Sequence, residues 1–225
     1  TDGNLIQGWL EYTSASYQKA FHQLMETAAA TKAFYDDTGK ELDGMKAQLG
    51  AIKERYEKRT IRLNDGRRVY VDESGKYAYQ DQYGAWNDLE AGALDEARAK
   101  HKALGDTAIT KDQKIELDEY EAEILYTQAM IEDNRQRIDR YTAAANNREM
   151  SEEKLDAARE QIDKDRAEVE DKLERVLNKQ RHVMRVIEPE AETTKAELND
   201  DLANDIFGAD KKTPQIPAKD GPGLT

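Results

Sequence analysis

Cysteine is absent from the 225 residues, and proline is confined to the last part of the chain. Without a thiol the chain can form no disulfide, no thiolate metal site and no cysteine nucleophile. Because proline breaks helices, continuous helix is permitted up to residue 188 and is disfavoured beyond it. The four prolines are Pro189, Pro214, Pro217 and Pro222.

Long apolar runs are also absent. No run approaches the roughly 18 residues that a membrane-spanning helix needs, so we expect no membrane span. The first residues, TDGNLIQGWLEY, lack the basic and then apolar pattern of a secretory signal. The sequence begins at Thr1 without a methionine, which leaves a removed upstream segment open. A cytoplasmic location is slightly favoured, and secretion stays open.

Sequence motifs of enzyme sites are lacking too. There is no GxxxxGK[ST] or GxGxxG phosphate loop and no DxDxDG calcium loop. The histidines, His22, His101 and His182, have no companion at i+4 for a helical zinc site, and we interpret His22 and His101 as packing residues. A thin helical coil also offers little concave volume for catalysis. We therefore expect a noncatalytic protein without a metal or another cofactor.

The chain has many charged residues, at 36%, against 38% apolar residues, and its net charge is −13. This composition is lean for a compact globule and is typical of long, solvent-exposed helices. The negative charge disfavours binding to nucleic acids and anionic membranes, because both are polyanions that bind protein cations.

A first long helix is predicted over residues 11–58. Apolar or small residues recur there at alternating intervals of four and three, which indicates a coiled-coil seam. Gly39, Gly44 and Gly50 each weaken a helix by up to about 1 kcal/mol, so a break within 36–44 is the alternative. The seam stays in phase across them, which favours one continuous helix. Its residues are Tyr17, Phe21, Leu24, Ala28, Thr31, Tyr35, Thr38, Leu42, Met45, Leu49, Ile52 and Tyr56.

Two further seams of similar length follow between residues 110 and 187. Thr110 with Gln113 forms a capping box, and Ser151 caps the next helix after a short polar break, so the two segments predict an antiparallel hairpin. The first seam contains Leu117, Tyr120, Ile124, Thr127, Ile131, Asn134, Ile138, Tyr141 and Ala145. The second contains Leu155, Ile162, Val169, Val176 and Val183, with Arg159, Arg166, Leu173, Gln180 and Ile187 four residues after each.

Three polar residues in these seams, Asn134, Arg159 and Arg166, allow two interpretations. They could mark a functional site, or they could set the register of the helices, with the arginine stems lying along the seam. We favour the second interpretation.

The predicted fold is mainly α: an elongated antiparallel coiled-coil bundle of three passes, with a small three-stranded β-meander after the first long helix. A two-helix arm beside a separate N-terminal helix is the alternative. We divide the chain into the long helix (1–59), the meander (60–86) and the return helix with the hairpin (87–188). Asn87 caps the return helix and Gly105 ends it. A short helix (189–208) and a disordered tail (209–225) complete the chain.

The meander is predicted from LNDGRRVYVDESGKYAYQ, residues 63–80. NDG and ESG each place glycine third in a three-residue loop, where a type I turn with a G1 bulge needs the left-handed conformation. This register pairs Ile61 with Val69 and Val69 with Tyr79; a two-residue loop would pair Ile61 with Tyr70 and scatter the apolar face. One face then carries Ile61, Val69, Val71, Tyr77 and Tyr79, and we expect it to pack on the end of the coil. The other face is basic and aromatic.

The basic residues near this meander stand out in an acidic chain, with seven lysines and arginines against three acidic residues between 53 and 68. They could bind a partner, or they could pair with glutamates such as Glu90 or Glu96 in a solvated network. The residues that we expect to contact a partner are Arg62, Arg68 and Tyr70, together with Arg55, Lys58 and Arg59.

These observations predict a noncatalytic interaction or scaffold protein, whose coil presents the basic, aromatic meander to a protein partner. One alternative is a nucleic-acid or anion binding module that uses the same residues. Another is an acidic secreted or mobile-element component that binds a basic partner through its helices. A homo-oligomer through the seams is a further form that the interaction could take.

Overall fold

The computed structural model describes residues 12–187. The short helix and the tail predicted at 189–208 and 209–225 lie outside the described residues. The strands and nearly all of the described helical length belong to one compact unit, which ends at Val183.

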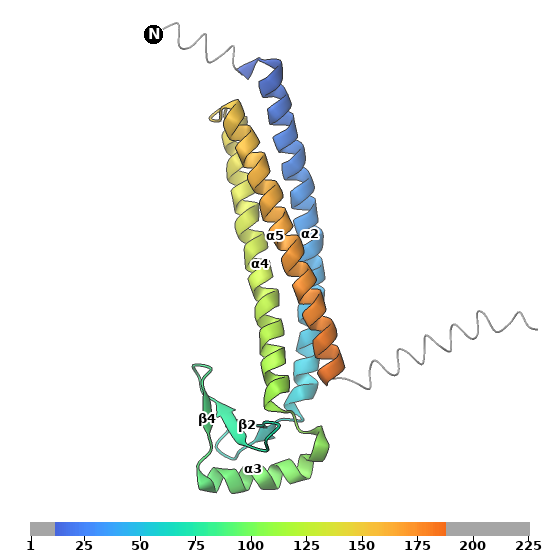
Figure 1. Ribbon diagram of the computed structural model, residues 1–225, viewed down its shortest axis with the longest axis vertical. Helices are drawn as coiled ribbons and strands as arrows, with labels where there is room; N and C mark the ends of the chain where they lie inside the picture. Colours follow the sequence, from blue (N-terminus) through green and yellow to red (C-terminus); the bar gives the residue numbers. More distant parts are fainter. Residues whose placement is uncertain (1–11, 188–225) are drawn as a thin grey trace, which may run out of the picture. The chain divides into compact units, whose positions relative to one another are not determined.

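Long helices make up most of this unit. α2 (Ala15–Glu57), α4 (Lys111–Asn146) and α5 (Glu152–Ile187) pack side by side as a bundle, with α2 and α4 antiparallel (Figure 1). α2 is 43 residues long and runs through Gly39, Gly44 and Gly50 without a break. At about 1.5 Å per residue it spans roughly 65 Å. The mainly α prediction and the continuity of the first helix are confirmed.

α2 is joined to α4 along its length, which excludes the alternative of a separate N-terminal helix. The Arg135 guanidinium lies 2.5 Å from the Asp36 carboxylate, and the Gln128 amide donates to Asp43 at 2.8 Å. α4 begins with the predicted capping box, in which the Thr110 side chain accepts from the Gln113 backbone.

The buried residues of the bundle follow the predicted seams closely. On α2 the single difference is that Ala20, and not Phe21, is buried. On α4 all predicted positions are buried except Tyr141. On α5 the second set was misplaced by one residue at its first two positions, because Ala158 and Asp165 are buried three positions after Leu155 and Ile162. Further along, Leu173 and Gln180 are only half-buried, and Ile187 is buried as predicted.

The arginines predicted at those α5 positions lie at the rim of the bundle. Arg159 donates to Gln23 at 3.1 Å, and Arg166 pairs with Glu170 at 2.9 Å while its guanidinium covers the Phe34 ring. Their long stems reach water from the seam edge, as snorkelling side chains do.

A polar layer crosses the middle of the bundle interior. The Asn134 amide donates to the Tyr35 hydroxyl at 3.2 Å, and Asp165 is buried with its side chain only 7% exposed. Its carboxylate accepts from Arg137 at 2.6 Å and from Gln161 at 2.7 Å. Burial raises the pKa of Tyr35, although the hydrogen bond from Asn134 opposes the shift. Each of the three long helices contributes to this layer, so it favours one register over a slip by a heptad.

Replacing Arg137 with methionine removes the cation beside buried Asp165. Breaking a buried pair costs about 3 to 5 kcal/mol, and since the Arg137 side chain is 35% exposed we expect the free energy of unfolding to fall by about 2 to 3 kcal/mol. Urea denaturation at neutral pH measures this change. Arg140→Met, at an exposed site on the same helix, serves as the control, and adding Asp165→Leu to Arg137→Met should restore most of the loss. An equal loss with and without Asp165→Leu would contradict the argument.

The β element is a four-stranded antiparallel meander in the order β1 (Ile61–Arg62), β2 (Arg68–Val71), β3 (Tyr77–Gln80) and β4 (Trp86–Asp88). Its first three strands have the predicted register, with Ile61 opposite Val69, Val69 opposite Tyr79 and Val71 opposite Tyr77.

The fourth strand is a correction to the prediction. Asn87 pairs with Tyr79 in β4 and does not cap a helix. α3 (Ala91–Leu104) begins later, with Glu90 at its N-cap, and ends as predicted at Gly105. Asparagine is a favoured N-cap residue, but the backbone of Asn87 is instead paired with β3 in the sheet.

The sheet lies between α3 and the end of the bundle (Figure 1). Its apolar face, with Ile61, Leu63 and Val69, packs on Ala93 and Ala97 of α3. The prediction that this face packs on the coil is therefore wrong.

The opposite face of the sheet is turned toward the bundle. Tyr70 lies with its ring 6.3 Å from that of Tyr56 in the last turn of α2. The Lys111 ammonium, in the first turn of α4, lies 4.8 Å from the centre of the Trp86 ring. In the plane of the sheet, Val71 forms a backbone bridge with Thr110, which directly precedes α4. Both faces of the small sheet are thus covered, in accord with the need of such a sheet for a packing surface.

Candidate interaction surface

The head, as we call residues 58–110, comprises β1 to β4, α3 and a short 3₁₀ helix, η1 (Gly105–Thr107). It contains nine lysines and arginines and nine aspartates and glutamates. The basic stretch recognised in the sequence is therefore balanced by acidic residues of the later strands and α3. A balanced head gives little electrostatic attraction to a polyanion.

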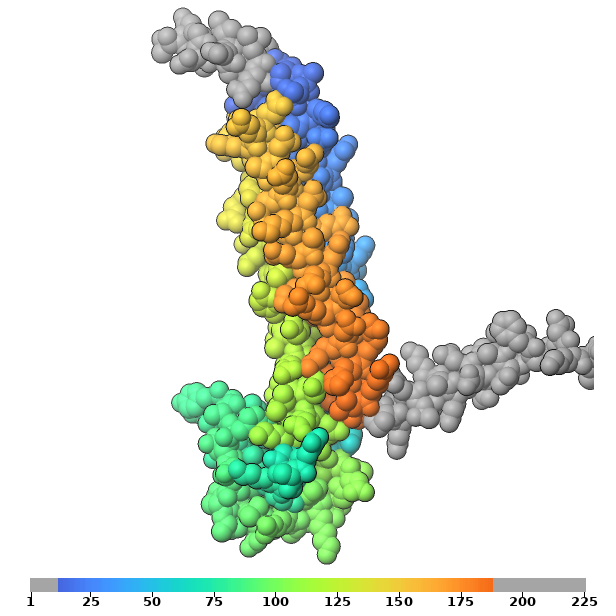
Figure 2. Space-filling view, in the orientation of Figure 1, coloured from blue at the N-terminus to red at the C-terminus, as the bar shows by residue number. Residues whose placement is uncertain are grey.

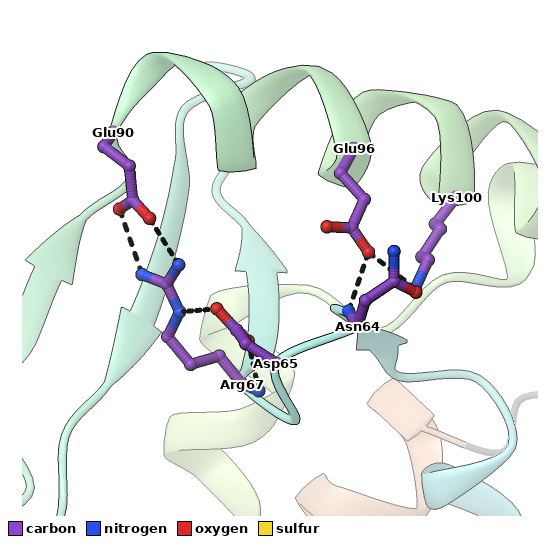
Figure 3. Close-up of polar contacts among 6 residues, drawn as sticks. All are labelled: Asn64, Asp65, Arg67, Glu90, Glu96 and Lys100. Atoms are coloured by element: carbon purple, nitrogen blue, oxygen red, sulfur yellow. Dashed lines mark hydrogen bonds and ion pairs between the residues drawn. The ribbon is translucent and has the colours of Figure 1, made fainter.

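Arg67 is fully engaged within the head (Figure 3). Its guanidinium makes a bidentate pair with Glu90 at 2.5 and 3.0 Å, and its Nε donates to Asp65 at 2.7 Å. The hydrogen bonds from Arg67 lower the pKa of Glu90 to about 2. Planar, two-point pairing of this kind is specific in geometry, and it ties the β1–β2 loop to the N-cap of α3.

A second polar contact joins the same loop to the middle of α3 (Figure 3). The Asn64 backbone N–H donates to Glu96 at 2.7 Å, and the Lys100 ammonium donates to the Asn64 side chain at 3.0 Å. The hydrogen bond from Lys100 lowers the pKa of Glu96. The alternative in which arginines of the basic stretch pair with Glu90 or Glu96 is confirmed for Arg67 with Glu90. Glu96 instead pairs with Lys100 of its own helix and accepts from the Asn64 backbone.

Acid should release Glu90 from Arg67. A carboxylate whose pKa is depressed by folding stabilises the fold above its unfolded pKa, near 4.5, and this contribution is lost as the pH falls through about 2. NMR titration of the Glu90 side-chain carboxyl should show a midpoint near 2, and Arg67→Gln should return it toward 4.5. Arg98→Gln removes a different cation, on α3 itself, and should leave the Glu90 midpoint unchanged. If both variants raise the midpoint equally, the pairing with Arg67 is not what lowers the pKa of Glu90.

Five of the six predicted contact residues lie near the point where the end of α2 meets the sheet. Arg62 and Arg68 share one carboxylate, that of Glu57, at 2.7 and 2.8 Å, and their side chains remain 56% and 50% exposed. The Arg59 guanidinium donates to the Thr107 carbonyl at 2.7 Å. Arg55 and Lys58 are exposed on α2 and at its C-cap. These five residues are brought together at one junction, where part of their charge is neutralised.

Tyr70 does not belong to an exposed surface. It is 2% exposed, and its ring packs against Tyr56 and edge-on against Trp86 at 5.7 Å. The expectation that it faces a partner is wrong, because the face of the sheet that carries it is covered by the end of the bundle. Burial raises its pKa.

A different tyrosine, Tyr83, is the most exposed large apolar side chain in the described part of the chain, at 86%. It lies in the loop of residues 81–85 between β3 and β4, at the apex of a hairpin that projects from the head (Figure 1). The Asp81 carboxylate accepts from the Tyr83 and Ala85 backbone N–H groups, both at 2.9 Å. The backbone of the loop is therefore ordered, while the Tyr83 ring that it carries is exposed to solvent.

A short repeat in the sequence could have revealed this third hairpin. Gly66, Gly75 and Gly84 are nine residues apart, and all have positive φ, at 91°, 80° and 86°. Asp72 and Asp81 precede the second and third glycine by three residues and accept the same backbone hydrogen bonds. The third loop therefore repeats the turn chemistry of the other two.

Asp81→Ala should loosen the apex of the β3–β4 hairpin. Hydrogen bonds from the Ala85 and Tyr83 backbone lower the pKa of Asp81, so the charged carboxylate is the form that holds the loop. We expect faster amide hydrogen exchange at Tyr83 and Ala85. Asp72→Ala is the matched control, since it should speed exchange at Ser74 and Lys76 and leave the apex unchanged. Unaltered exchange at Tyr83 in Asp81→Ala would show that the carboxylate does not order the loop.

The histidines do not gather. His22 is exposed, which corrects its interpretation as a packing residue, whereas His101 lies 2.7 Å from the Tyr77 hydroxyl and packs edge-on against its ring. His182 lies 3.6 Å from Glu116. Within residues 12–187, no three histidine or acidic side chains are grouped so that they could hold a metal ion. None of the described helices combines the length and apolarity required to cross a membrane.

Comparison of the chain with models of known protein families, with curated proteins and with solved structures found no match.

Proposed function

We propose that the protein is a noncatalytic interaction protein, in which the bundle supports the head and the head binds a protein partner through the apex of the β3–β4 hairpin. The observation that carries the proposal is Tyr83, 86% exposed on a loop whose backbone is held by Asp81. Tyrosine supplies a large contact area at low conformational entropy, and it is enriched among residues that dominate binding energy.

Order in the loop matters for this role. A partner that buries Tyr83 need not also freeze the loop, because the Asp81 hydrogen bonds already restrict it. Preorganisation of this kind raises affinity by lowering the entropy cost of association.

The five basic residues at the junction of α2 and the sheet are the second proposed contact surface. Arg62 and Arg68 keep half of their side chains exposed, so they can exchange Glu57 for an acidic group of the partner. Charges at such a site affect association rate and specificity more than affinity. The balanced charge of the head favours a protein partner over nucleic acid.

Photo-crosslinking tests the hairpin directly. A benzoylphenylalanine at position 83 should give a discrete crosslinked protein in extracts of the native source, whereas the same probe at exposed Glu160 on α5 should not. Unlabelled wild-type chain should compete for the crosslink, and Tyr83→Ser should compete at least about tenfold less well, a loss of about 1.4 kcal/mol. Equal competition by both chains would refute the role of Tyr83.

The same competition assay tests the junction. Arg62→Glu with Arg68→Glu should weaken competition without changing helix content, measured by circular dichroism. Arg140→Glu with Lys164→Glu makes the same charge change at exposed sites on the bundle and should compete like the wild type. If both double variants compete equally, the junction is not a contact surface.

A further inference from the structure

A groove of about 750 Å³ runs along the outside of the bundle between α4 and α5. The two helices lie side by side in the view of Figure 2. Its two walls have opposite charge. Glu116, Glu119 and Glu123 line it from α4, and Lys172, Arg175 and Lys179 line it from α5. The groove is formed by the bundle without the head, and the proposed function does not use it.

The acidic and basic rows have the same spacing. Each places its three residues at steps that keep side chains on one side of a helix, three and four along α4 and three and four along α5. Because the two helices are antiparallel, Glu116 and Glu119 are level with Lys179, to which both are paired. Glu123 is correspondingly level with Lys172. The acidic row on α4 and the basic row on α5 therefore have the same length and lie at the same level along the bundle axis.

The charges at the Lys172 end of the groove are not neutralised by one another. In the described part of the chain Glu123 makes no ion pair, and the Lys172 ammonium lies 4.9 Å from the centre of the Tyr126 ring. Among residues 12–187, Arg175 pairs only with Asp171 on its own helix, and both side chains are more than half exposed, at 60% and 58%. An exposed pair of this kind contributes little to stability, so Arg175 can exchange its partner.

Apolar surface accompanies these charges. Tyr126 is 55% exposed and lines the groove together with Ala122. The heptad seams, by contrast, are buried within the single chain. An association of this chain with itself would therefore use the outer face of α4 and α5 and not the seams.

We infer that this groove is the interface of a parallel homodimer. A twofold axis parallel to the helices brings α4 of one copy against α5 of the other at the same height. Glu116, Glu119 and Glu123 of each copy then face Lys179, Arg175 and Lys172 of the other. A twofold axis across the helices would instead bring acidic row against acidic row, and like charges in contact disfavour that arrangement.

This symmetry makes a charge-swap experiment decisive. In one variant Glu119 and Glu123 are both changed to lysine, so that both walls are basic; in the other Lys172 and Arg175 are both changed to glutamate, so that both walls are acidic. Sedimentation velocity should show a dimer for the wild type, with an affinity that falls as salt is added. Each variant alone should dimerise at least about tenfold more weakly, and an equimolar mixture should form the heterodimer.

The mixture separates the proposal from damage to the fold, because loss of structure in each variant cannot be restored by mixing. If either double variant loses helix content, Glu123→Lys and Lys172→Glu repeat the test at two sites where the described residues show no ion pair. A wild type that stays monomeric throughout the micromolar range, or a mixture that stays monomeric, overturns the inference. Tyr83→Ser should dimerise like the wild type, so this test and that of the proposed function can fail separately.

Discussion

The structure depends on the burial of three heptad stripes against one another within a single chain. Each stripe is narrow, and none of the three long helices can bury its apolar residues alone. Alternation of three- and four-residue steps keeps the stripe of α2 on one side for its whole length, including Gly39, Gly44 and Gly50. The intrinsic cost of those glycines is offset because the seam residues around them are buried.

The same constraint explains the polar layer. Heptad seams are nearly repetitive, so a slip of one helix by seven residues would still place apolar against apolar side chains at most levels. At the level of Asn134 and Asp165 it would place a carboxylate against aliphatic neighbours, away from Arg137. Burial of a carboxylate without its partner costs several kcal/mol, and this makes the polar layer a marker of register.

Sequence reasoning succeeded where the determinants are local and repeated. The glycines at 66 and 75 select a turn type, and the turn type fixes the strand register, which the structure confirms. The seam residues were found for the same reason. On α5 the prediction was wrong by one position at two levels, because Arg159 and Arg166 have long apolar stems that resemble seam residues, while Asp165 is not expected in a core.

The errors in the head have another origin. Whether Asn87 caps a helix or pairs in a strand depends on β3, and no local propensity reports that. The exposure of Tyr83 and the burial of Tyr70 depend on which face of the sheet the bundle covers. Both residues are tyrosines in strand-and-turn sequence, so only the tertiary arrangement distinguishes the core residue from the candidate contact.

The connection between head and bundle has a mechanical consequence. The chain enters the head from α2 and leaves it into α4, and the Val71–Thr110 bridge and the Ile109 to Arg59 backbone hydrogen bond, at 3.0 Å, brace the two crossings. A single flexible connection would let the head swivel about one point. With two braced crossings, a pull on the β3–β4 hairpin loads two long helices together, so the bundle resists bending at the junction and transmits force along its axis.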